Sequence, residues 1–103
     1  MLILIGYLIP WFFVRQPKKI KGMAKPSPKF DGDPVLVALG AEIRRVRAGI
    51  GISQEALAVD AGLDRSYVGG IERGEHNITI MNISKIADAL KVKPSRLLES
   101  SGL

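Results

Sequence analysis

Cysteine is absent from this 103-residue chain, and histidine occurs only once, at position 76. Without thiols the chain cannot build a disulfide scaffold or a thiolate metal site, and one imidazole cannot supply a zinc cluster or a di-metal centre. No glycine-rich phosphate loop, paired carboxylates or nucleophile and base stand out either. We therefore expect no metal, no cofactor and no enzyme. The thiol-free composition fits a reducing, cytoplasmic setting.

Acidic residues are missing from the first 22 positions. The whole chain has 15 Lys+Arg and 10 Asp+Glu, a formal charge of +5, but Arg15, Lys18, Lys19 and Lys21 supply four of those charges. The remaining residues therefore carry about +1. A basic total favours a polyanionic partner, yet in a nearly neutral domain the local placement of cations decides. The cations that we expect to matter are Arg44, Arg45, Arg65 and Arg73.

The N-terminal segment 1–22 is apolar and then basic. Its apolar run, residues 1–14, contains Pro10 and is shorter than the roughly 20 residues that a membrane-spanning helix needs. Positive charge follows the run and no small-residue cleavage site appears, which is the wrong order for a secretory signal. Three interpretations stay open: translation from upstream of a natural start at Met23, which we favour, an interfacial membrane anchor with a basic flank, or an arm that packs on the domain or a partner.

Prolines and glycines recur within residues 15–34 and disfavour regular structure there. We therefore predict a flexible linker over 23–33 and a single domain over 34–103. Leu36, Leu39, Ile43 and Val46 mark one face of a helix that starts after Asp33 and ends near Gly49. Ser53, Asp64 and Thr79 are N-cap candidates for three further helices, and Pro94 opens a fifth. The fourth helix has an apolar stripe that we expect to lie mainly in the core, formed by Ile80, Ile83, Ile86, Ala87 and Leu90. The fifth helix is expected to bury Leu97 and Leu98. No period-2 alternation marks a strand, which predicts an all-α fold.

The segment 54–73 fits a helix-turn-helix unit. Ala58 lies where its two helices would cross, so only a small side chain fits there. Gly62 lies at the turn, where a positive φ is expected. The five positions that must be apolar to hold the two helices together are all apolar: Leu57, Ala61, Leu63, Val68 and Ile71. An arbitrary corner of two helices would share only some of these features.

Residues 36–99 resemble the phage-repressor (Cro-type, XRE) helix-turn-helix family. The resemblance rests on a Ser-Gln opening of the second helix, an Ala-Gly-Leu turn and an Ile-Glu-Arg-Gly ending of the third. It implies a five-helix, lambda-repressor-like DNA-binding domain. It also implies a homodimer that binds a palindromic operator in double-stranded DNA and regulates transcription, often of nearby genes including its own, by repression or by activation.

The resemblance implies that the third helix enters the major groove. Arg65 is then the main candidate for a bidentate contact with guanine, and Ser66 for a base or a phosphate. Gln54 resembles the family's phosphate-binding glutamine at a helix N-terminus. The full set of implied DNA-binding residues is Ser53, Gln54, Asp64, Arg65, Ser66, Tyr67, Gly69, Gly70, Arg73, His76 and Asn77.

Several of these positions keep two interpretations. We expect Gly69 and Gly70 on the outward side of the third helix, where they either let the backbone approach DNA or reflect tolerated drift. Tyr67 is either a phosphate contact or a ring at the core edge. We expect His76 to be a polar loop residue rather than a switch.

Glu72 is expected to form a structural ion pair with Arg47 instead of contacting DNA. For dimerisation, Met81, Leu98 and Leu103 are the interface candidates. Two alternatives to an operator-binding regulator remain: an antitoxin-type or protein-interaction module with a protein partner, and a membrane-tethered DNA binder. Neither the operator sequence nor an inducer can be read from the chain.

Overall fold

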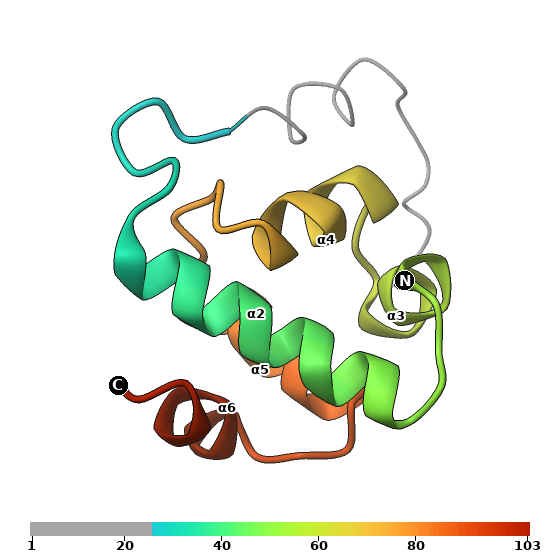
Figure 1. The fold of residues 1–103 in the computed structure, drawn as a ribbon. Coiled ribbons are helices and arrows are strands. Elements are labelled where there is room, and N and C mark those ends of the chain that lie inside the picture. The colour runs from blue at the N-terminus through green and yellow to red at the C-terminus, as the bar shows by residue number, and fades with distance from the viewer. Residues whose placement is uncertain (1–25) are drawn as a thin grey trace.

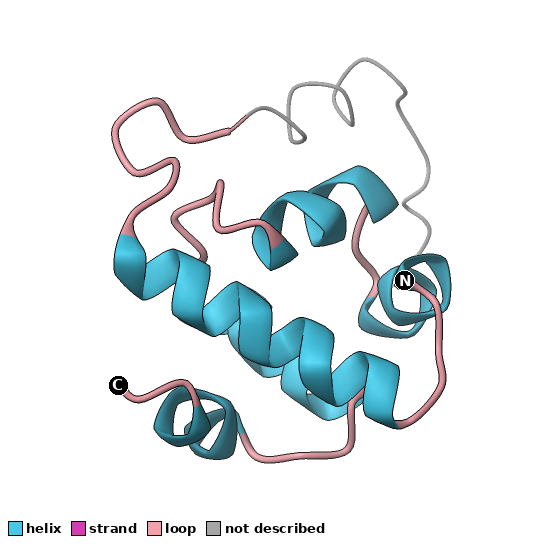
Figure 2. Cartoon of the chain, viewed as in Figure 1, coloured by secondary structure: helices cyan, strands magenta, loops and turns pink. Residues whose placement is uncertain are grey.

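The computed structural model describes residues 26–103, and every regular element in that range is a helix (Figure 1, Figure 2). The helices are α2 (Pro34–Gly49), α3 (Gln54–Ala61), α4 (Arg65–Glu72), α5 (Ile80–Ala89) and α6 (Pro94–Ser100). The predicted all-α, five-helix domain is confirmed. The interpretations of residues 1–22 lie outside the described residues.

Side-chain caps set the starts of the helices. Asp33 Oδ1 accepts a hydrogen bond from the Val35 amide at 2.9 Å, and Ser53 Oγ and Thr79 Oγ1 cap α3 and α5 at 3.0 and 3.1 Å. Each such cap typically contributes about 1 kcal/mol. Gly62 ends α3 with φ +70°, a left-handed conformation that strains a residue with a Cβ. The predicted helix boundaries therefore follow from local chemistry.

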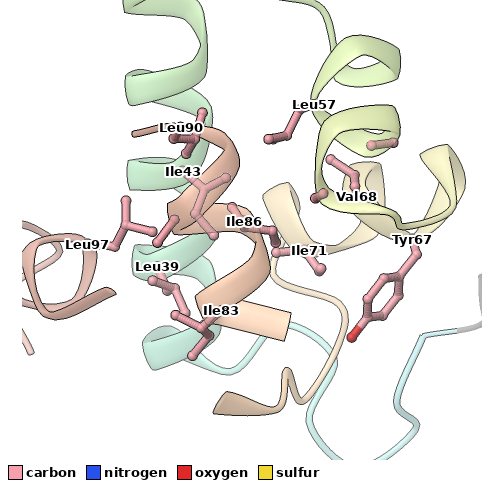
Figure 3. Packing of buried hydrophobic residues seen from close by; sticks show 13 residues of the cluster. Leu39, Ile43, Leu57, Tyr67, Val68, Ile71, Ile83, Ile86, Leu90 and Leu97 are labelled. Atoms are coloured by element: carbon pink, nitrogen blue, oxygen red, sulfur yellow. The ribbon is translucent and has the colours of Figure 1, made fainter. Parts of the chain in front are cut away.

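The core lies where α2, α3, α4 and α5 meet, with α6 closing it against α2 and α5 (Figure 3). Ile43, Leu57, Val68, Ile86, Leu90 and Leu97 are completely enclosed. Truncating one such side chain to alanine typically costs about 2–5 kcal/mol. The prediction that Ile80 belongs to the buried stripe is wrong, because this first residue of α5 is 65% exposed.

A close crossing of two backbones fixes α4 on α2. Gly40 is buried in α2, and a Cβ there would collide with the Ile71 carbonyl oxygen and lie 2.8 Å from that of Glu72. Only glycine permits this approach. This crossing could not be predicted from the sequence, since Gly40 lies in an ordinary helical pattern.

Residues 27–33, which we call the strap, pack against the loop after α4 (Figure 1). The Ser27 amide donates to the Glu75 carbonyl at 2.8 Å, the Gly32 amide donates to the Gly74 carbonyl at 2.9 Å, and Ser27 Oγ accepts from the Asn77 amide at 3.0 Å. The prediction of a flexible linker therefore does not hold for these residues. Their partners are more than 40 positions away in the sequence, beyond the reach of a local pattern.

Candidate nucleic-acid interface

Helices α3 and α4 form the predicted helix-turn-helix unit. Leu57, Ala58, Ala61, Val68 and Ile71 are buried, and Leu63 is half-buried between them and solvent. Asp64 caps α4, its Oδ2 accepting from the Tyr67 amide at 3.1 Å. The cap fixes the start of α4, whose first two residues are exposed while the next two are buried.

Arg65 and Ser66, the first two residues of α4, are both exposed. Arg65 makes no ion pair with any residue in 26–103, so its guanidinium has donors available for an outside acceptor. Of the other predicted contacts, Ser53, Arg73 and Asn77 are exposed, and Gln54 and Asp64 are half-buried. An uncommitted arginine beside hydroxyl and amide groups suits recognition of a base edge or a phosphate.

A buried network ties α2, α3 and α4 together. Arg47 donates two hydrogen bonds to the Glu72 carboxylate, from Nε to Oε2 at 2.6 Å and from Nη2 to Oε1 at 3.1 Å. Its Nη1 donates to the Ile52 carbonyl at 2.8 Å. The predicted pair is therefore present, but it is buried: the Glu72 side chain is only 2% exposed. Hydrogen bonding to Glu72 raises the pKa of Arg47, so this guanidinium stays charged.

Gln54 joins the same network. Its Nε2 donates to Glu72 Oε1 at 2.9 Å, so the last residue of α4 fixes the first side chain of α3. The sequence analysis did not predict this contact. The signal was that Arg47, Gln54 and Glu72 are polar residues on three helices that meet at one junction. The amide group has a second Nε2 hydrogen that remains available to an acceptor outside the domain.

Two of the four cations expected to attract DNA are already paired. Arg45 binds Glu42 at 2.6 Å and Arg73 binds Glu75 at 2.7 Å. These hydrogen bonds hold the pKa values of both carboxyl groups below their usual range. Of the four, only Arg44 and Arg65 form no ion pair within residues 26–103.

Four of the predicted contact residues are buried. Gly69 and Gly70 do not lie on the outward side of α4, because the Gln54 and Arg73 side chains cover the first and the His76 ring covers the second. His76 lies in the loop after α4, as predicted, but it is buried there, with only 5% of it exposed. For Tyr67 the core-edge interpretation holds: its ring is buried, and its hydroxyl accepts from Asn82 Nδ2 at 2.9 Å (Figure 3).

A family model described as helix-turn-helix matches residues 43–97, more than half of the chain. The chain belongs to the helix-turn-helix family. The resemblance to the XRE-type regulators is thereby confirmed, and membership places the chain among DNA-binding transcription regulators, a family that is not one of enzymes.

Similar helix-turn-helix proteins carry regulatory names. Control protein C.BamHI of Bacillus amyloliquefaciens is 39% identical over 66 residues, which cover 63% of this chain and 82% of that protein. The Neisseria hypothetical transcription factor of Neisseria meningitidis is 41% identical over 73 residues, 71% of this chain and 69% of the relative. The crystal structure of the restriction-modification controller protein C.AhdI from Aeromonas hydrophila is 52% identical, with a TM-score of 0.60, and covers 60% of this chain and 94% of its own.

None of the helices in residues 26–103 is long and apolar enough to cross a membrane. The same residues contain no cluster of histidine and carboxylate side chains suited to a metal ion.

Proposed function

We propose that the protein is a sequence-specific transcription regulator that binds a palindromic operator as a homodimer, with α4 in the major groove. The observation that carries the proposal is the exposed first turn of α4, where Arg65 has no ion-pair partner within residues 26–103. Bidentate hydrogen bonding of this guanidinium to guanine would supply direct readout. The buried Gly69 and Gly70 add no reading side chain, so few residues specify the site.

Contacts to phosphate would set the register of α4 in the groove. Gln54 and Ser53 lie at the N-terminus of α3, where free amides and the helix dipole favour an anion. Because Glu72 already orients the Gln54 side chain, the second Nε2 hydrogen of Gln54 could bond to a phosphate with little further loss of side-chain freedom. Asn77, exposed beyond α4, is a second candidate on the other side of the reading turn.

The surface of α5 is the proposed dimer interface. Met81 is 65% exposed and lies beside Ile80, which is equally exposed. The two other candidates are Leu103, which is also exposed, and Leu98, which is half-buried. A shallow depression flanks this apolar pair along α5, lined by Met81, Ser84, Lys85, Asp88, Val92 and Pro94. A two-fold dimer would set its reading helices about 34 Å apart, one turn of DNA.

The names of two structural relatives suggest which genes this protein controls. C.AhdI and C.Esp1396I are restriction-modification controller proteins, and the latter is 34% identical with a TM-score of 0.61. We therefore place the operator upstream of this protein's own gene, within a restriction-modification locus.

A gel-shift assay tests the proposal. The protein should retain a duplex from upstream of its own gene at about 50 mM salt and release a shuffled duplex of the same composition. Sedimentation should show a dimer that Met81→Asp weakens, while Val59→Asp, at another exposed apolar position, leaves it intact. A folded dimeric sample that binds no upstream DNA would contradict the proposal.

A further inference from the structure

His76 is buried against α4 although it lies in the loop that follows. Its ring centroid is 4.9 Å from that of Tyr67, with the planes tilted by 56°. Its Nε2 is the one buried side-chain polar atom in residues 26–103 that has no hydrogen-bond partner. A polar ring in such a place needs an explanation, because buried nitrogens are nearly always paired.

Gly70 provides the space that the His76 ring occupies. A Cβ at Gly70 would lie 2.5 Å from His76 Cδ2 and collide with Nε2. Glycine inside a helix is unfavourable relative to alanine, yet here the bare backbone is needed for the ring to fit. Tyr67 and Gly70 are three residues apart and so lie on one face of α4. The imidazole therefore packs on two successive turns of the helix.

The strap holds His76 in this position. Ser27 bonds to the residue on either side of it, its amide to the Glu75 carbonyl at 2.8 Å and its Oγ to the Asn77 amide at 3.0 Å. With both neighbours fixed to the strap, the side chain between them is directed toward α4. The loop, the strap and the helix thus form one packed unit.

We propose that His76 is a positioning residue for DNA recognition, whose ring, matched by Gly70 and held by Ser27, sets the placement of α4 and hence of Arg65. This inference rests on the proposed function. His76 itself does not touch DNA. Its role is to keep the reading turn at one angle to α3, so that base contacts and phosphate contacts can form together.

A size-exchange cycle tests the packing without DNA. Gly70→Ala should lower the Tm by about 5 °C in the wild-type background and by much less in the His76→Ala background, where the ring is gone. Gly69→Ala is the matched stability control, because its Cβ would meet only the ends of the Arg73 and Gln54 side chains, at 3.1 and 3.5 Å. Equal Tm losses for Gly70→Ala in both backgrounds would overturn the proposal.

Affinity for the operator tests the positioning. At a temperature where circular dichroism shows every variant folded, His76→Ala and Ser27→Ala should each weaken binding by about tenfold. His76→Phe should restore it, because a phenyl ring fills the same space. Unchanged affinity in His76→Ala would overturn the proposal.

A pH profile of operator binding, taken where circular dichroism shows the protein folded, adds a readout that a loss of fold would not move. Burial lowers the pKa of His76, which faces Asp31 from the strap, Arg73 and Glu75 from its own segment, and Tyr67 from α4. Protonation at low pH would place a buried charge beside Gly70, so wild-type affinity should fall as the pH drops below the ordinary histidine range while that of His76→Phe stays level. Equal profiles would count against the proposal. If the wild type binds no operator, the proposed function fails, and amide exchange in α4, faster in His76→Ala and normal in His76→Phe, still decides the positioning.

Discussion

Lys91 is the one non-glycine residue in 26–103 with a positive φ, +64°, directly after the C-cap of α5. A Cβ in this conformation costs about 1–2 kcal/mol, and the exposed lysine side chain gains nothing in return. We predict that Lys91→Gly raises the free energy of unfolding by about 0.5–1 kcal/mol in urea denaturation. Lys85→Gly, an exposed lysine inside α5, should instead lower it by about 1 kcal/mol. A loss of stability in Lys91→Gly would show that the left-handed turn is not strained.

Arg65 carries the direct readout in the proposed complex. Arg65→Ala should weaken operator binding by about 1–3 kcal/mol and relax the preference at one base pair, as measured by titrating a set of single-substituted duplexes. Arg44→Ala is the control, since another exposed arginine should change specific and random DNA binding equally. An equal loss on random DNA for Arg65→Ala would make it a phosphate contact.

The junction of α2, α3 and α4 depends on the buried pair of Arg47 and Glu72. Arg47→Met leaves the Glu72 carboxylate without its cation, and we predict a loss of about 3–5 kcal/mol in the free energy of unfolding. Arg47→Met with Glu72→Met should cost less than the sum of the single changes. The matched control is Arg45→Met. The Arg45 side chain is 70% exposed, so losing its pair with Glu42 should leave the free energy of unfolding nearly unchanged.

Elements whose limits depend on neighbouring residues could be predicted from the sequence. The caps at Ser53, Asp64 and Thr79 and the turn at Gly62 involve only residues that are close in the sequence. The spacing of apolar residues predicted most of the buried core. The pair of Arg47 and Glu72 followed from the family resemblance. What could not be predicted depends on chain segments that meet only in the fold: Gly40 beneath α4, Ser27 on the loop, and His76 on Gly70. For the same reason the outward placement of both glycines was wrong.

For the whole molecule, the strap extends the packed unit beyond the domain start predicted at Pro34. Deleting residues 1–22 should leave helical circular dichroism and operator choice unchanged, because Ser27 and its partners remain. Deleting residues 1–31 removes the Ser27 contacts and should lower the free energy of unfolding by roughly 1–3 kcal/mol, at about 1 kcal/mol per hydrogen bond. If the shorter deletion loses helix content, residues before the strap belong to the core.

Acid should destabilise the molecule in two steps. The pKa of His76 is lowered from 6.5 by burial, so as pH falls below that value the unfolded chain binds a proton that the folded chain does not. The carboxyl groups of Glu42 and Glu75 have pKa values lowered from 4.5 by arginine hydrogen bonds, and their contribution, complete above that value, is lost as pH falls further. Urea denaturation from pH 7.5 to 3.5 should show both steps. In His76→Phe only the second should remain, and an unchanged first step would assign it to another group.

The two ends of the described chain lie in different surroundings. The strap leads into the domain beside the loop that follows α4, whereas α6 and the C-terminus lie on the far side of α2 (Figure 1). A bulky fusion partner joined at Leu103 would therefore lie away from the strap and the loop after α4, whereas one joined just before Ser27 would lie beside that loop and its candidate phosphate contact, Asn77. Because Leu103 is also a candidate dimer residue, tags and surface tethers for binding studies belong at the C-terminus behind a linker that leaves Leu103 uncovered.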